Sequence, residues 1–190
     1  LEGFGMSIYF DFDEVDAFTV GALGEPGARL FLLQARRGAT SVTIKCEKRQ
    51  AGAIAEYLRR VLVDLPDPPD KPAASLLELE MPADAAFVLG PVGLGYDREN
   101  DRLLVQLEEL VETDIESDPT EAEDDGTDPV ERLRGLADDV DRGHVRLFLS
   151  RSQAAAFCDH ADSVVAAGRP PCRWCGHPIN PDGHACPRMN

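Results

Sequence analysis

The chain has 190 residues, with 19 Lys or Arg against 35 Asp or Glu, so its formal net charge at pH 7 is −16. An acidic chain repels phosphate backbones, and the lack of a basic stripe argues against nucleic acid as a partner. The charge-free stretch 85–96 is too short to span a bilayer and is interrupted by glycines and a proline, which argues against a membrane partner.

The first half of the chain predicts four strands and a helix. Residues 1–5 precede Met6, where the strand pattern begins, and we interpret them as a cloning remnant, with an upstream start as the alternative. Alternating apolar residues predict strands at 7–12, 17–23, 29–35 and 41–46. The apolar period then becomes helical, which predicts a helix over about 48–65 that Pro66 ends. Residues 67–75 are expected to be a linker.

The second half predicts a similar order of elements. An extra strand is expected at 76–80, before strands at 87–93, 103–107 and 145–149. Apolar residues then predict a second helix, with Ser150 and Gln153 as a capping box at its start. Its apolar positions lie 103 residues after those of the first helix. They are Ala154, Phe157, Cys158, Ala161, Val164 and Val165.

An acidic insert, 108–142, separates the last two strands. From Glu108 to Asp128 the chain carries eleven acids and no Lys or Arg, so we expect a solvated, mobile loop. Pro129 then opens a short amphipathic helix that ends near Asp141.

The element order predicts an α+β fold built from two tandem ββ-β-α units. The units, 7–66 and 76–168, would be pseudo-duplicated and form one domain over 6–168, with an antiparallel-rich sheet and helices packed on it. The alternative is that the halves look alike only because alternation and amphipathicity are common. A small zinc-binding tail, 169–190, follows.

The tail carries three of the five cysteines at metal-ligand spacing. Cys172 and Cys175 are three apart, and His184 and Cys186 share one face of an extended segment. Four such ligands predict tetrahedral Zn²⁺ at about 2.0–2.3 Å, with no open position for water, hence a structural ion. His177 is the alternative nitrogen ligand; a redox Cys-x-x-Cys or a disordered tail is the alternative to a metal. Thiols used in this way indicate a reducing cytoplasm.

Outside the tail, two cationic residues are the best candidates for a ligand site. Lys48 and Arg151 open the two predicted helices at equivalent positions and could together line an anion site. Ordinary solvated helix entrances are the alternative. Cys158 is expected in the core with His160 as an exposed neighbour, because side chains two positions apart diverge by about 200° on a helix.

Motifs along most of the chain resemble a known family. They are Gly24 to Gln34, Ser41-Val42, Glu47-Lys48-x-Gln50, Gly93 to Asp97, and Cys172-x-x-Cys-Gly followed by Pro-Asp-Gly-His-Ala-Cys-Pro-Arg188. In these the chain is similar to the largely actinobacterial family catalogued as domain of unknown function 3090. The resemblance implies no established activity, and the acidic insert looks longer here than is usual for the family.

The sequence favours a cytoplasmic, non-catalytic binding or adaptor protein with one structural zinc. Its partner would be another protein or a small molecule, met by the tail or by the glycine-rich hairpins. The second hypothesis is an enzyme that acts on a small phosphorylated or nucleotide-like substrate near Lys48 and Arg151. The third is weak nucleic-acid binding through the zinc tail, which the net charge disfavours.

Overall fold

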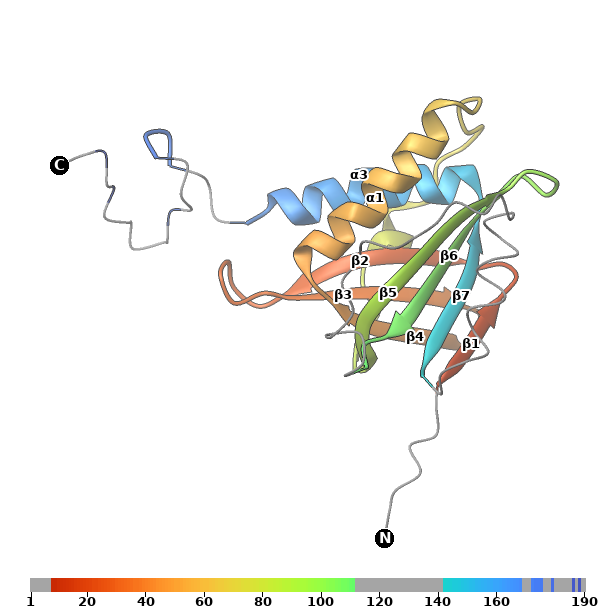
Figure 1. Ribbon diagram of the computed structural model, residues 1–190, viewed down its shortest axis with the longest axis horizontal. Helices are drawn as coiled ribbons and strands as arrows, with labels where there is room; N and C mark the ends of the chain where they lie inside the picture. The colour runs from red at the N-terminus through yellow and green to blue at the C-terminus, as the bar shows by residue number, and fades with distance from the viewer. Residues whose placement is uncertain are drawn as a thin grey trace, which may run out of the picture.

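The computed structural model describes residues 8–111, 142–168, 172–175, 179, 186 and 188. These residues form a mixed seven-stranded sheet with two α-helices on one of its faces, as Figure 1 shows. The predicted α+β class is confirmed. The helix expected to open at Pro129 lies outside the described residues.

The first half follows its predicted elements closely. Its strands are β1 (Tyr9–Phe12), β2 (Ala17–Leu23), β3 (Leu30–Arg37) and β4 (Thr40–Cys46), and they precede helix α1 (Lys48–Val63). Gln50 caps the start of α1, since its Oε1 accepts a hydrogen bond from the Glu47 N–H at 2.8 Å. The two antiparallel hairpins of β2, β3 and β4 form a meander.

The second half has three strands and a helix. They are β5 (Ala85–Asp97), β6 (Arg102–Glu109), β7 (His144–Leu149) and α3 (Arg151–Ala166). The predicted capping box of α3 is confirmed, because Ser150 Oγ accepts from the Gln153 N–H at 3.2 Å and Gln153 Oε1 accepts from the Ser150 N–H at 2.9 Å. After the additional strand β1, an order of three strands and a helix occurs from β2 to α1 and again from β5 to α3.

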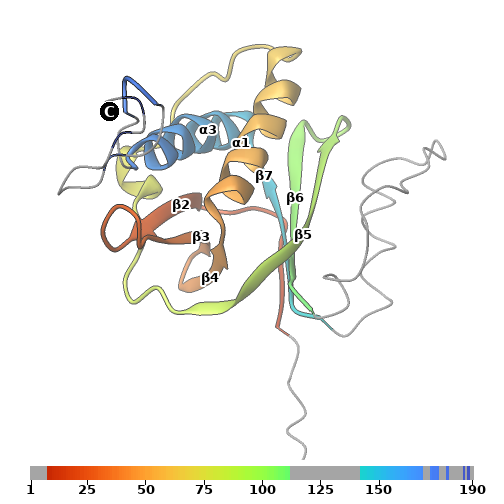
Figure 2. The same cartoon turned by 60° about the vertical axis from the view of Figure 1, so that its left-hand side comes forward.

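The sheet is curled so that its two ends approach each other. Its strand order is β1-β7-β6-β5-β4-β3-β2, which places β1 and β2 at opposite ends. Only residues 13–16 join these two strands, and the step from Phe12 to Ala17 covers at most about 18 Å. The strands β2 to β4 consequently run across β5 to β7 (Figures 1 and 2).

Strand β5 turns the other corner of the sheet. Its first part pairs with β4 in parallel, and its second part pairs with β6 in antiparallel fashion. The pairing with β6 shifts between Leu89 and Val92, around Gly90 and Pro91. A Cβ on Gly90 would lie 2.7 Å from the Leu110 Cα, so this bend requires glycine.

The apolar core lies between the sheet and the two helices. Phe18 of β2 stacks on Phe157 of α3 with ring centroids 4.7 Å apart. The apolar faces predicted for both helices supply the buried positions Ala51, Ile54, Ala55, Leu58, Ala154, Phe157, Cys158 and Ala161. This core holds both helices on the same face of the sheet.

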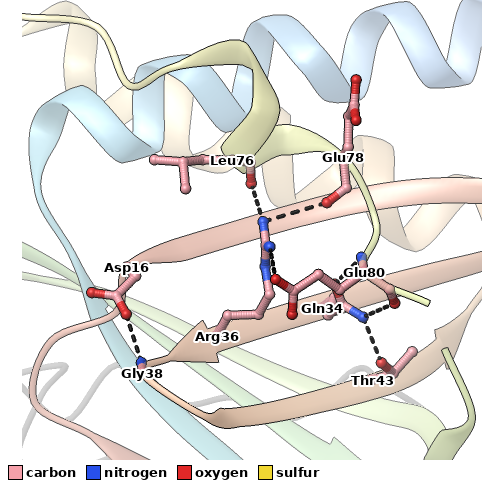
Figure 3. A network of polar contacts seen from close by, with 8 residues as sticks. All are labelled: Asp16, Gln34, Arg36, Gly38, Thr43, Leu76, Glu78 and Glu80. Atoms are coloured by element: carbon pink, nitrogen blue, oxygen red, sulfur yellow. Dashed lines mark hydrogen bonds and ion pairs between the residues drawn. The ribbon is translucent and has the colours of Figure 1, made fainter. Parts of the chain in front are cut away.

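The segment 76–80 corrects one prediction. A strand was expected there, but the chain forms a 3-10 helix, η1 (Ala74–Leu77), and then crosses the sheet face opposite the helices. Figure 3 shows buried side chains of β3 holding this crossing segment. Arg36 Nη2 donates to the Leu76 carbonyl at 2.7 Å, and Gln34 Nε2 donates to the Glu80 carbonyl at 3.0 Å. Because the segment crosses a face of the sheet, it has no strand edge beside it to pair with, and side chains bind its carbonyls instead.

Candidate metal centre

Three cysteine side chains converge in the C-terminal tail. The sulfur atoms of Cys172, Cys175 and Cys186 all lie within 4.8 Å of one another, and those of Cys172 and Cys186 are 3.9 Å apart. Tetrahedral zinc with Zn–S bonds of about 2.3 Å places its sulfur ligands about 3.8 Å apart. The donor set and its spacing therefore fit a zinc ion.

The turn between Cys172 and Cys175 stabilises the thiolate form of Cys172. Cys172 is buried, and the Trp174 N–H donates to its sulfur at 3.4 Å. This bond, followed by one from the Cys175 N–H, lowers the pKa of the Cys172 thiol. The thiolate form is the one that binds metal, so the turn favours the ligand state before any ion arrives.

The fourth predicted ligand falls outside the described residues, as does its alternative. His184 and His177 both belong to parts of the tail that the structure does not describe. Within the described ranges, Cys172, Cys175 and Cys186 are the single cluster of three or more Cys, His or carboxylate side chains whose ligand atoms converge.

The structure does not bring Lys48 and Arg151 together. Arg151 lies at the far end of the helix pair, where its Nε contacts Asp101 Oδ2 at 3.0 Å and its Nη1 donates to the Pro66 carbonyl at 2.5 Å. Lys48 lies at the other end, since a Cβ on Gly168 would be 3.4 Å from its Nζ. The 16 residues of α3 separate these ends by about 24 Å.

The two remaining cysteines are buried and protonated. Burial raises the pKa of the Cys158 thiol to about 11 and that of the Cys46 thiol to about 12. Cys158 lies in the core as expected, with its sulfur 3.3 Å from the Ala55 carbonyl oxygen. Thiols of this kind are poor nucleophiles at neutral pH.

The prediction that His160 is exposed is wrong. It is half-buried against β2, and its Nε2 lies 3.0 Å from the Val20 carbonyl oxygen. Because a carbonyl only accepts, the ring must carry a proton on Nε2. β2 is the last strand of the sheet, so this carbonyl has no strand partner on that side. A sequence shows neither that edge nor the helix that covers it.

The described residues of the body line, among other hollows, two cavities of about 360 Å³ each. One lies between α1 and β5, where Tyr57 Oη donates to the Leu94 carbonyl at 3.2 Å. The other lies where β1 passes into β2. There the guanidinium carbon of Arg102 lies 4.4 Å from the centroid of the Phe148 ring, and Arg102 Nη1 donates to the Asp13 carbonyl at 2.9 Å. In each cavity, one of these polar side chains, Tyr57 or Arg102, joins neighbouring segments of the chain.

No helix among the described residues is long and apolar enough to cross a membrane. Neither a curated protein nor a solved structure matches the chain at a significant level. A family model does match, over residues 10–186, and its description is protein of unknown function (DUF3090). The match spans strands β2 to β7, both helices and the cysteine cluster, so the chain belongs to the DUF3090 family.

Proposed function

We propose that the protein is a non-catalytic binding or adaptor protein whose tail is folded by one structural zinc ion. The convergence of Cys172, Cys175 and Cys186 carries this proposal. His184 completes the ligand set, and four protein ligands leave no position for a water to be activated. The use of thiols as ligands supports a reducing cytoplasm as the location in this proposal.

The composition of the tail supports a structural role for the ion. Between residues 171 and 190 the only large apolar side chains are those of Trp174, Ile179 and Met189. So few apolar groups cannot form a core of their own, and metal binding supplies the missing folding energy.

Buried polar side chains of the body hold the chain itself, as Gln34 and Arg36 hold the segment 76–80, which supports a non-catalytic role. No observation favours an enzyme with a shared anion site, because Lys48 and Arg151 lie at opposite ends of the helix pair. Nucleic-acid binding has only the small tail to support it against a net charge of −16.

Metal analysis tests the zinc directly. We expect elemental analysis of the purified protein to find about one zinc per chain. Cys175→Ser should release the ion while the sheet and helices stay folded, as measured by circular dichroism. Cys158→Ser is the matched control, because its hydroxyl can donate to the Ala55 carbonyl and it is no ligand. If Cys175→Ser and Cys158→Ser retained the same metal content, the assignment would be wrong.

Removal of the tail tests the adaptor role. A chain ending at Gly168 should keep the fold of the body and lose the partners that the full chain captures from its native cell. Equal capture by both chains would place the binding surface on the body. Turnover of a small phosphorylated metabolite by the shortened chain would show that the protein is an enzyme.

A further inference from the structure

The turn between the first two cysteines presents an exposed aromatic side chain. Trp174 is the only tryptophan of the chain, and 51% of its surface is exposed. The guanidinium carbon of Arg173 lies 5.0 Å from its ring centroid. Arg188, two residues beyond Cys186, donates from Nη1 to the Trp174 carbonyl at 3.2 Å. We name these three residues, Arg173, Trp174 and Arg188, the indole tip.

The indole tip is a positively charged feature on an acidic protein. Residues 169–190 contain three arginines and one acid, Asp182, for a formal net charge of +2, which becomes +1 when three cysteine thiolates hold Zn²⁺. The whole chain has −16, so residues 1–168 carry −18. Both arginines of the tip are exposed, and no carboxylate within the described residues pairs with either of them.

The metal ligands set the geometry of the indole tip. Trp174 lies inside the Cys-x-x-Cys turn, and its N–H bonds the Cys172 sulfur at 3.4 Å. An ion that holds Cys172, Cys175 and Cys186 fixes this turn and brings Arg188 beside it. An aromatic side chain held rigidly in solvent loses little conformational entropy when a partner covers it.

We infer that the indole tip docks an acidic segment of a partner protein, an inference that rests on the proposed zinc-folded tail. Carboxylates of that segment would pair with Arg173 and Arg188, and an apolar side chain would cover the free part of the indole. Guanidinium groups bind carboxylates through paired hydrogen bonds, and Trp and Arg are the residues most enriched at the energetic centres of protein interfaces.

The charge distribution favours a protein segment over a nucleic acid. Counterion release provides most of the affinity for nucleic acids, and it grows with the number of phosphates contacted. The tip offers two arginines, whereas the other residues of the chain repel a long polyanion through their −18 charge. A short acidic segment that touches only the tip avoids most of that repulsion.

The fluorescence of Trp174 provides the test, since no other tryptophan contributes to it. The probe is a terminally blocked pentapeptide with leucine at its centre, one glutamate on either side of it and glycine at both ends, titrated into the zinc-loaded full chain at low salt. We expect a saturable blue shift of the emission, with a dissociation constant below about 1 mM. The double variant Arg173→Gln, Arg188→Gln should weaken binding at least about tenfold, and added salt should weaken it too.

Arg49→Gln with Arg60→Gln is the matched control, because both arginines are exposed on α1 and remain outside the tip. This pair should leave the titration unchanged. No shift with the peptide at about 1 mM, or an equal loss in both double variants, overturns the inference. Binding of an oligothymidylate without binding of the peptide overturns it in favour of single-stranded nucleic acid. Zinc content is measured on the same sample. A zinc-loaded protein that does not bind the peptide contradicts the docking inference alone, whereas a protein without zinc contradicts the proposed zinc-folded tail.

Discussion

The side-chain amide of Gln34 pairs with the main chain of Glu80 through two hydrogen bonds that run in opposite directions. Gln34 Nε2 donates to the Glu80 carbonyl at 3.0 Å, and Gln34 Oε1 accepts from the Glu80 N–H at 2.8 Å (Figure 3). Gln34 Nε2 also donates to Thr43 Oγ1 at 3.1 Å, so both of its N–H groups have acceptors. The buried amide thus does for the crossing segment what a neighbouring strand does in a ladder.

Replacement of this amide should destabilise the protein more than replacement of a comparable buried amide. We expect Gln34→Leu to lower the free energy of unfolding by about 2–3 kcal/mol, because it leaves two main-chain groups of Glu80 without partners. Gln106→Leu is the matched control at a buried position of β6, where the amide donates to Glu108 Oε1 at 2.8 Å. Its cost should be about 1 kcal/mol, since Glu108 keeps its ion pair with Arg142. Urea unfolding of both variants checks the difference, and equal costs would contradict it.

The guanidinium of Arg36 should matter through the carbonyls that it binds rather than through its ion pair. Its side chain is 10% exposed and donates to the Leu76 carbonyl, whereas its carboxylate partner Glu80 is 65% exposed. We expect Arg36→Met to cost about 2–4 kcal/mol and Glu80→Gln less than about 1 kcal/mol. Urea unfolding at low and high salt measures both. If Glu80→Gln cost as much as Arg36→Met, the ion pair would be the dominant contact.

The local pattern of the sequence was enough for most strands and both helices, because it reports which side of an element is buried. It failed at 76–80, where alternating leucines indicate a strand. That segment lies across the sheet face and is held by Gln34 and Arg36, which precede their partners in it by 46 and 40 residues. Such a contact leaves no signal in the local alternation. The parallel pairing of β1 with β7 is equally remote in sequence and equally invisible to it.

Of the two candidate sites, one was predictable from the local sequence and the other was not. The cysteine cluster was predictable because its spacing is short and its ligand chemistry is restrictive. Lys48 and Arg151 occupy equivalent positions in the chain, but α1 and α3 run in opposite senses, so their starts lie at opposite ends of the helix pair (Figure 1). Equivalent positions in sequence meet in space only when the packing of the helices brings them together.

Three glycines should respond differently to the same added methyl group. In Gly90→Ala the Cβ would lie 2.7 Å from the main chain of Leu110, so we expect a loss of about 1–3 kcal/mol. In Gly21→Ala the Cβ would meet the end of the Leu79 side chain, which can move, so the loss should be smaller. Gly52→Ala meets nothing within 4 Å inside α1 and should stabilise by about 0.5–1 kcal/mol. Thermal unfolding gives the order, and a destabilised Gly52→Ala would refute the helix argument.

His144 should make the folded protein sensitive to mild acid. It is half-buried at the start of β7, and the Tyr9 ring meets it edge-on with centroids 4.7 Å apart. Burial lowers the pKa of His144 below its usual 6.5, and the nearby Arg146 lowers it further, while Glu108 and Asp11 oppose the shift. The unfolded chain therefore takes up this proton at a higher pH than the folded chain does.

The sign of the effect follows from that proton. As the pH falls through 6.5, His144 becomes protonated in the unfolded chain but stays neutral in the folded chain. The free energy of unfolding therefore decreases until the pH has fallen below the folded-state pKa. His144→Gln should remove this part of the loss between about pH 7.5 and 5, with little change in slope above that range. Glu108→Gln should enlarge the loss instead, because the carboxylate that favours the charged imidazole is gone. Urea unfolding across the pH range compares the slopes. Identical slopes for the wild type and His144→Gln would mean that the imidazole accepts its proton as readily in the folded sheet as in the unfolded chain.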